Sequence, residues 1–248
     1  MSATHTAALL LRAHPYGETS RVLRFLTRDR GIVGVMARGV RSGKGSGLDT
    51  FAGGRLTYYH KSNRDLHTFK EFGVERPRRG LGRHPLRLAG ASVLADLVLR
   101  HGGDADAESL FDSLSRALDD LADADPPEVP SVLLREGWGL IAVLGYHPSL
   151  ERCPRCGEVL GRDEVGRFDF EQGGVRCARC AEEGGGGPRL GPVARAQLAA
   201  LVSGTVPPEL RKPRAHLRLL SDFVTYHLAG SRELASFRVL GALLPSDD

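Results

Sequence analysis

Four cysteines, in two closely spaced pairs, constrain this chain more than any other feature. Cys153/Cys156 and Cys177/Cys180 follow the pattern C-x2-C-x20-C-x2-C and are the only cysteines in the sequence. Two thiolates separated by two residues can turn back onto one cation, and a second such pair completes a tetrahedron. The spacing is typical of a zinc ribbon. It predicts a structural Zn²⁺ that folds a segment too small to fold by itself.

The same motif bears on catalysis and redox chemistry. Four sulfur ligands leave no open coordination position, so the predicted zinc is structural rather than catalytic. A thioredoxin-like redox site is the other use of C-x-x-C, but it needs a single motif beside a βαβ unit instead of a pair. Disulfides are disfavoured in the cytosol, where we expect the chain to remain.

The segments on either side of residue 80 have different periodicities. Before it, five short apolar stretches are separated by turn signals, and this pattern predicts a small antiparallel barrel. The five-stranded OB barrel is the natural candidate, and such barrels bind oligonucleotides across one face and its loops. The predicted strands cover residues 4–12, 18–27, 31–37, 54–60 and 65–74.

After residue 80 the apolar residues recur at helical spacing, except around the cysteines. The first three predicted helices are expected to bury one shared core. The fold class is therefore α+β, a barrel followed by a helical domain that a four-cysteine, zinc ribbon-like segment interrupts. The predicted helices cover residues 85–100, 107–123, 131–148, 192–204 and 213–230. The predicted domains are 1–80, the DNA-binding barrel; 81–150, the first helical part; 151–190, the zinc segment; and 191–248, the second helical part.

Charge is unevenly distributed along the chain. The 248 residues carry a net charge of +4, but residues 1–87 hold 17 basic and 6 acidic side chains, a net +11, and the remainder carries −7. A basic first third favours a polyanionic partner for that part. The alternative is that surface arginines merely solubilise a small domain.

The stretch VMARGVRSGKGSG, residues 35–47, concentrates this charge in Arg38, Arg41 and Lys44 without an acid. It is not a P-loop, because three residues rather than four separate Gly39 from Gly43, and because Lys44 precedes a glycine instead of Ser or Thr. The remaining partners are nucleic-acid backbone and water. Cations among glycines could neutralise phosphates that approach the main chain closely.

Four aromatic residues on the predicted neighbouring strands are candidates for stacking on bases. Core packing is the alternative function for each of them. The four are Phe51, Tyr58, Tyr59 and Phe69.

We find no signature of an enzyme. The sequence lacks the G-x-S-x-G, H-E-x-x-H and dinucleotide-binding motifs. A run of aspartates, Asp119, Asp120, Asp123 and Asp125, could suggest a two-metal nuclease, but a solvated helix face explains it more simply. The sequence also contains no run of about 18 apolar residues, the length that a membrane helix requires. We expect a protein that is not an enzyme, has no small-molecule substrate and is not in the membrane.

Three segments of the sequence resemble the RecO family of bacterial recombination mediators. They are LLLRAHPYGETSRVLRFLTRDRGIVGVMARGVR, with its YGE turn and its ARG before the basic loop; the pair CPRCG and CARC; and YHLAGSRELASFRVL near the end. The resemblance spans nearly the whole chain in the family's order. The closing AGSREL differs from the shorter basic run usual in the family, and some members lack the cysteines.

The resemblance implies a DNA-repair mediator. Such proteins bind single- and double-stranded DNA, anneal complementary strands without nucleotide hydrolysis, act with RecR, engage SSB and help to load RecA. It implies a cytoplasmic, nucleoid-associated protein whose barrel is the main DNA-binding region. The alternative is a zinc-stabilised protein-interaction module whose DNA binding is incidental. The DNA-binding residues implied here are Arg38, Arg41 and Lys44, and secondarily Arg21, Arg24, Lys61 and Arg64.

Overall fold

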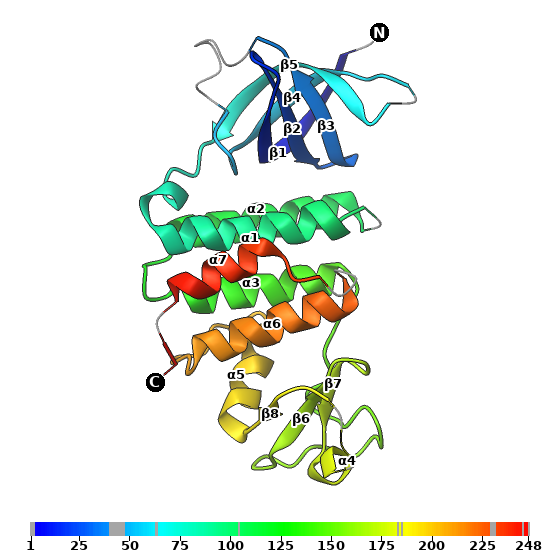
Figure 1. Ribbon diagram of the computed structural model, residues 1–248, viewed down its shortest axis with the longest axis vertical. Helices are drawn as coiled ribbons and strands as arrows, with labels where there is room; N and C mark the ends of the chain where they lie inside the picture. Colours follow the sequence, from blue (N-terminus) through cyan, green and yellow to red (C-terminus); the bar gives the residue numbers. More distant parts are fainter. Residues whose placement is uncertain are drawn as a thin grey trace. The chain divides into compact units, whose positions relative to one another are not determined.

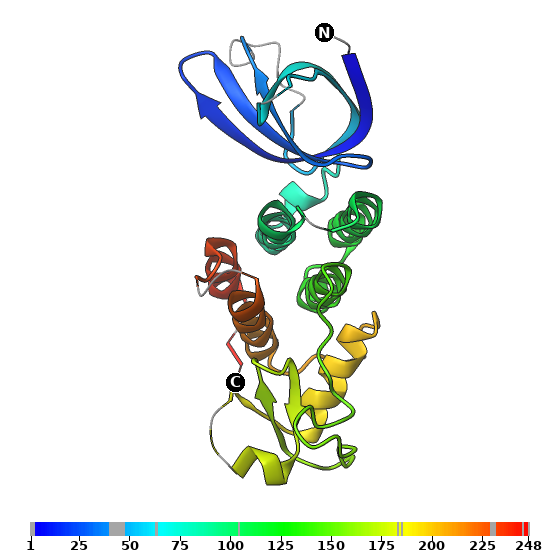
Figure 2. The same ribbon diagram turned by 90° about the vertical axis from the view of Figure 1, so that its right-hand side faces the viewer.

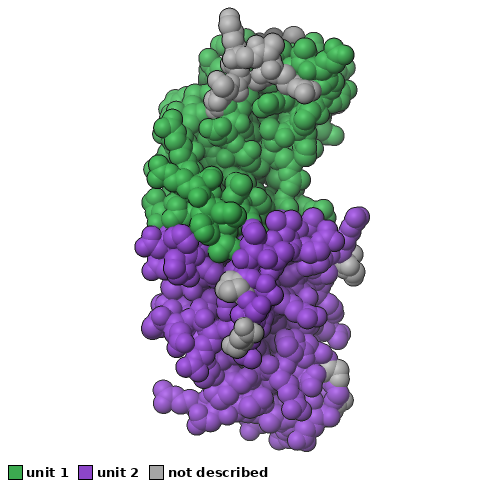
Figure 3. Space-filling model, turned by 60° about the vertical axis from the view of Figure 1, so that its left-hand side comes forward, with its two compact units in different colours: residues 1–123 green, residues 124–248 purple. Residues whose placement is uncertain are grey.

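The computed structural model describes residues 3–39, 48–62, 64–103, 105–182, 184, 186–228, 232–244 and 246–247. The chain divides into two compact units, Met1–Asp123 and Ala124–Asp248, which Figure 3 distinguishes by colour. We describe each unit by itself. Of the helices described, none is both long enough and apolar enough to cross a membrane.

Unit 1 begins with a closed five-stranded barrel in the order β1-β2-β3-β5-β4, which confirms the predicted OB-type architecture (Figures 1 and 2). Neighbouring strands are antiparallel except for β3 and β5, which pair in parallel. The strands are β1 (Ala3–Tyr16), β2 (Ser20–Thr27), β3 (Gly31–Ala37), β4 (Gly53–Tyr59) and β5 (Leu66–Arg76).

Because every second side chain of a strand faces inward, one set of apolar side chains fills the inside of the barrel. Leu23 and Phe25 of β2 and Val33 and Val35 of β3 belong to one buried apolar cluster, so the residues between them face outward. A bulge between Leu10 and Arg12 shifts the register of β1 against β2. The other buried members of the cluster are Ala8, Leu10, Ala37, Leu56 and Tyr58.

Two helices follow the barrel within unit 1, after the short 3-10 turn η1 (Leu81–Arg83). They are α1 (Pro85–His101) and α2 (Ala107–Asp123), and their bounds match the predicted helices closely. Pro85 stands at the first turn of α1, where its missing N–H costs no hydrogen bond. The helices bind the barrel through ion pairs, Arg12 with Asp96 of α1, and Arg28 with Glu108 and Asp112 of α2.

In its described residues, unit 2 combines five helices with a small three-stranded sheet in the order β7-β6-β8. Trp138 of α3 packs edge-on against Phe223 of α6, and Phe223 in turn contacts Phe168 of β6. These rings form an aromatic core that joins the sheet to the helices. The elements are α3 (Val129–Val143), β6 (Gly166–Asp169), β7 (Gly174–Arg176), α4 (Ala178–Glu182), β8 (Arg189–Leu190), α5 (Pro192–Val202), α6 (Pro213–His227) and α7 (Ala235–Leu243).

The α+β class is confirmed, while the finer organisation remains a prediction. The structure places α1 and α2 in unit 1 and α3 in unit 2. The predicted boundaries near residues 80, 150 and 190, and the predicted shared core of the first three helices, stay predictions.

Candidate nucleic-acid interface and metal centre

The predicted DNA-binding cations that the structure describes follow strand β3 and its two neighbours. Arg21 and Arg24 lie on β2, where they pair with Ala37 and Gly34 of β3. Arg38 follows directly after β3, and Lys61 and Arg64 lie in the turn that leads from β4 to β5. We call these five residues the basic strip. Arg41 and Lys44 lie outside the described residues.

Glycine at position 34 makes room for the middle of this strip. A Cβ atom there would lie 3.1 Å from the guanidinium of Arg24 and 3.0 Å from the carbonyl oxygen of Asp65. The Arg24 side chain therefore lies across the surface of β3 at Gly34. Because Leu66 of β5 pairs with Gly34 on its other side, Arg64 is two residues from the same rung of the sheet.

The basic strip differs from the other cations of the barrel in its ion pairs. Arg12, Arg28, Arg76 and Arg78 are bound to acids of α1 and α2. Three more, Arg30, Arg55 and Lys70, lie within 4.0 Å of an acid, in the β2–β3 turn for Arg30 and on β4 and β5 for the other two. Within the described part of the chain, none of the five strip residues has an acidic partner. Arg24, Arg38 and Arg64 are exposed, and Arg21 and Lys61 are half-buried.

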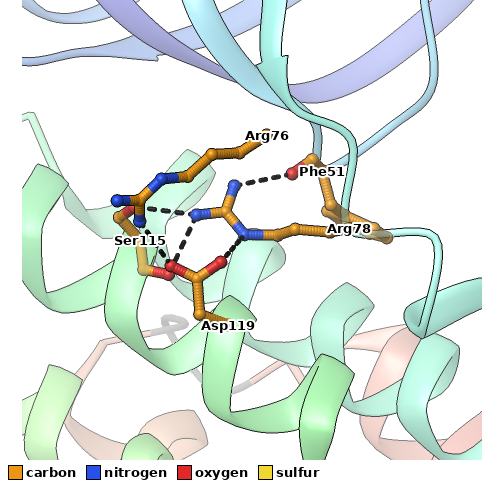
Figure 4. A network of polar contacts seen from close by, with 5 residues as sticks. All are labelled: Phe51, Arg76, Arg78, Ser115 and Asp119. Atoms are coloured by element: carbon orange, nitrogen blue, oxygen red, sulfur yellow. Dashed lines mark hydrogen bonds and ion pairs between the residues drawn. The ribbon is translucent and has the colours of Figure 1, made fainter.

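The most heavily bonded cation, Arg78, was not singled out by the sequence. Its side chain is only 2% exposed, and it donates to the Asp119 carboxylate at 2.7 Å and to the Phe51 carbonyl at 3.0 Å. It also donates to the backbone oxygen of Ser115 at 3.0 Å and to its hydroxyl at 2.8 Å (Figure 4). Arg76 binds the other oxygen of Asp119 at 2.8 Å. This network joins the barrel to α2. Asp119, the first of the clustered aspartates, therefore has a structural function.

For two of the four candidate aromatics, Tyr58 and Phe51, the structure favours the alternative of core packing. Tyr58 is fully buried and Phe51 is 4% exposed, because both side chains fill the interior of the unit. Phe69 packs against the barrel core, and Tyr59 is half-buried on β4.

His67, beside Lys61, contributes little positive charge at neutral pH. The rings of His60 and His67 lie 4.5 Å apart, and His67 also stacks on Tyr58 at 5.3 Å. Burial lowers the pKa of His67 below its ordinary value of about 6.5, and the nearby His60 and Arg30 lower it further. The permanent cations at this end of the strip are therefore Lys61 and Arg64.

In unit 2, the structure brings all four predicted metal ligands together. The sulfur atoms of Cys153, Cys156, Cys177 and Cys180 lie within 4.8 Å of one another, and those of Cys156 and Cys177 are 3.8 Å apart. A tetrahedral Zn²⁺ with bonds of about 2.3 Å requires sulfurs about 3.8 Å apart, so the site fits such an ion. It is the only such group of three or more potential ligands among the residues that the structure describes.

Local backbone geometry prepares the thiols for a cation. Gly157 has φ +75° and donates to the carbonyl of Cys153 at 2.8 Å, which closes the first turn around the site. Burial disfavours the Cys153 thiolate, but hydrogen bonds from the backbone of Cys177, Cys156 and Arg155 outweigh it and lower the pKa of Cys153 to about 6. Burial and the neighbouring thiols raise the pKa of Cys180 to about 12. A bound cation would offset the repulsion between the thiolates that hold it.

The residues around the thiols hold the module together. The Glu164 carboxylate accepts from the backbone N–H of Ala178 at 2.7 Å and of Gly161 at 2.8 Å, and so connects the two halves of the segment. Arg195 of α5 donates to the carbonyl oxygens of Gly161 and Arg162. Arg176, between the two cysteine pairs, is buried against Asp169. These contacts are structural, and the sequence alone did not indicate them.

The fold and the sites define a class of protein, an OB-type barrel joined to a helical part that carries a four-cysteine metal-binding module. Residues 1–78 match the family model Recombination protein O N terminal, and residues 83–234 match Recombination protein O C terminal. The chain belongs to the RecO family. The resemblance noted in the sequence is thereby confirmed.

Relatives that match most of the chain share one name. A protein of Anaeromyxobacter sp. (strain K) named DNA repair protein RecO is 33% identical, over 99% of this chain and 98% of its own length. The protein of that name from Rubrobacter xylanophilus is 31% identical, over 95% of this chain and 96% of its own. The Bacillus subtilis relative, also named DNA repair protein RecO, is 27% identical over 73% of this chain and 69% of its own length.

Proposed function

We propose that this protein is a DNA-repair mediator that binds single- and double-stranded DNA and anneals complementary strands without ATP. By this proposal it helps to load the RecA recombinase onto strands coated with SSB, in cooperation with RecR. It acts in the cytoplasm at the nucleoid, and it acts by binding rather than by catalysis. The relatives' shared name as DNA repair proteins supports this proposal.

The observation that carries the proposal is the basic strip. Its five described cations have no acidic partner in the described part of the chain, whereas α1 and α2 neutralise four other arginines of the barrel. The strip lies along β2 and β3 and the β4–β5 turn, the region where OB barrels bind oligonucleotides. Cations held there can bind the phosphates of two strands and reduce their mutual repulsion, so that bases can pair.

Annealing of SSB-coated complementary oligonucleotides without ATP tests this proposal. We compare wild type with Arg24→Ala/Arg38→Ala, and with the matched control Arg55→Ala/Lys70→Ala, which removes two exposed barrel cations that have acidic neighbours. Wild type and control should accelerate annealing. The strip variant loses two phosphate contacts, and each contact contributes about 0.7 to the slope of log affinity against log salt concentration. At 0.1 M salt this variant should therefore bind single strands about 25-fold more weakly.

We also propose that the metal is Zn²⁺ and that its function is structural. Cys153, Cys156, Cys177 and Cys180 would hold it, and it would supply tetrahedral cross-linking of two turns that share no large core. The sulfur distances support this assignment.

A second candidate function is a protein-interaction module, and one groove in unit 2 favours it. The groove has a volume of about 400 Å³ and is lined by apolar residues such as Val193 and Leu219, with Arg211 and Lys212 beside them. An acidic tail with apolar side chains, as the resemblance implies for SSB, would suit it. If wild type and both double variants bind SSB equally and none accelerates annealing, this function replaces the mediator.

A further inference from the structure

Among the described phenylalanine and tyrosine residues of the barrel, Tyr16 is the one with a strongly exposed side chain. It is 60% exposed, and it ends β1 at the turn to β2, where Gly17 has φ +59°. In Figure 2 the hairpin formed by these two strands extends at the side of the barrel. A tyrosine with this exposure contributes little to the core of unit 1, so its ring is available to a ligand.

The register of the sheet places this ring on the outer face of the strip. Tyr16 pairs with Ser20, about one strand spacing of 4.8 Å away, and Arg21 pairs with Ala37, the last residue of β3. Since Arg21 and Ala37 lie in the inward-facing register, Tyr16 and Ser20 face outward. The exposed Arg38 follows directly after Ala37, at the same end of the barrel.

Partly exposed apolar residues continue this face toward Arg24. The next row along the strands contains His14, Val22 and Met36, of which Val22 and Met36 are half-buried. The row after it contains Arg24, lying across Gly34. An exposed ring and an apolar surface between two arginines can contact the faces of bases while the cations hold the backbone.

The charges at the hairpin tip favour a base over a phosphate. Residues 17–19 contain one acid, the exposed Glu18, and no cation. A phosphate would be repelled there, whereas an unpaired base can stack on a tyrosine ring regardless of its identity. Bases inside a duplex are already stacked and paired, so they cannot use this ring.

We propose that Tyr16 stacks on an unpaired base and thereby gives the barrel a preference for single-stranded over double-stranded DNA. This inference rests on the proposed DNA binding by the basic strip and deepens it. Arg24 and Arg38 bind the backbone of either kind of DNA, and the Tyr16 ring adds stacking on an exposed base.

Filter binding with three probes of equal length tests this proposal: a single-stranded oligothymidine, an abasic oligomer with the same backbone, and a duplex. Tyr16→Ala should weaken binding of the oligothymidine about 5- to 150-fold. It should leave the abasic oligomer and the duplex within about twofold of wild type. Tyr16→Phe should retain oligothymidine binding, because the ring remains. Tyr226→Ala, which removes a 53% exposed tyrosine of unit 2, is the matched control and should bind like wild type.

The outcomes separate this inference from the proposal beneath it. If Tyr16→Ala binds the oligothymidine like wild type, or loses affinity for all three probes equally, the stacking assignment is wrong and the strip stands. If wild type binds no DNA at all, both proposals fail.

Discussion

Arg78 shows how a cation that adds to the charge of the sequence can have a structural function in the fold. It stands in a basic stretch, RPRRG, that adds to the apparent charge of the first third of the chain. In the fold its guanidinium is buried and bound to Asp119, Ser115 and Phe51. Both Arg78 and Phe51 have positive φ, 46° and 73°, a conformation that costs about 1–2 kcal/mol per residue. The hydrogen bonds between them and α2 offset this strain.

Replacement of Arg78 should therefore destabilise unit 1. We expect Arg78→Ala to cost about 3–5 kcal/mol, because it leaves buried acceptors without donors. Arg76→Ala, which removes the 66% exposed partner of the same carboxylate, should cost under about 1 kcal/mol. Hydrogen exchange of the backbone amides of β4 and α2 measures the loss of stability in both variants. Equal protection in the two variants would mean that the Arg78 network does not hold the barrel on α2.

At the scale of elements, hydrophobic periodicity predicted most of the fold. The segment 31–37 coincides with β3, and 107–123 coincides with α2, because strand alternation and a helical stripe are local patterns. The β1 strand extends four residues beyond its predicted end, to Tyr16, because pairing with β2 continues past the core. The β6–β8 sheet was not predicted, because its strands are two to four residues long and depend on the cysteine turns.

The candidate sites were predictable to different degrees. The metal ligands follow from spacing alone, since the chemistry needs those four sulfurs. The basic strip could not be identified from charge alone, because arginine is the proposed DNA contact at position 24 and a structural donor to Asp96 at position 12. Only the positions of the acids on α1 and α2 separate the two functions.

Removal of the metal should affect the cysteine module first. Wild type should contain about one zinc per chain, and Cys177→Ser should lose it, because three ligands remain. A chelator should then abolish amide protection in β6 and β7, which lie within this module. The strands of the barrel should keep their protection. Elemental analysis and hydrogen exchange measure these effects, and full protection of β6 after complete zinc removal would contradict a folding function for the metal.

For the whole molecule, local placement of charge matters more than its total. Residues 1–123 hold 19 basic and 14 acidic side chains, a net +5, because α1 and α2 bring acids to the basic barrel. Residues 124–248 carry a net −1. Net charge alone is therefore too small in either unit to account for specific binding of a polyanion.

Salt dependence of DNA binding should distinguish contact from net charge. Arg24→Ala/Arg38→Ala should reduce the log–log salt slope for single strands by about 1.4, which corresponds to two lost contacts. Glu151→Gln/Glu171→Gln, which removes two exposed acids of unit 2, changes the net charge by the same amount in the opposite direction and should leave the slope unchanged. If the salt slope changes with net charge in both variants, DNA binding depends on total charge rather than on contacts made by Arg24 and Arg38.

The aromatic core of unit 2 contains a natural fluorescent probe, Trp138. Trp138 is the only tryptophan of the chain, and its ring contacts Phe223, which contacts Phe168 of the metal-binding module. Tryptophan emission therefore originates from unit 2 alone, from a site 1% exposed and two rings away from β6. Metal loss should shift that emission, while events confined to the barrel should leave it unchanged. Unit 2 can thus be followed separately from the barrel in the unlabelled protein.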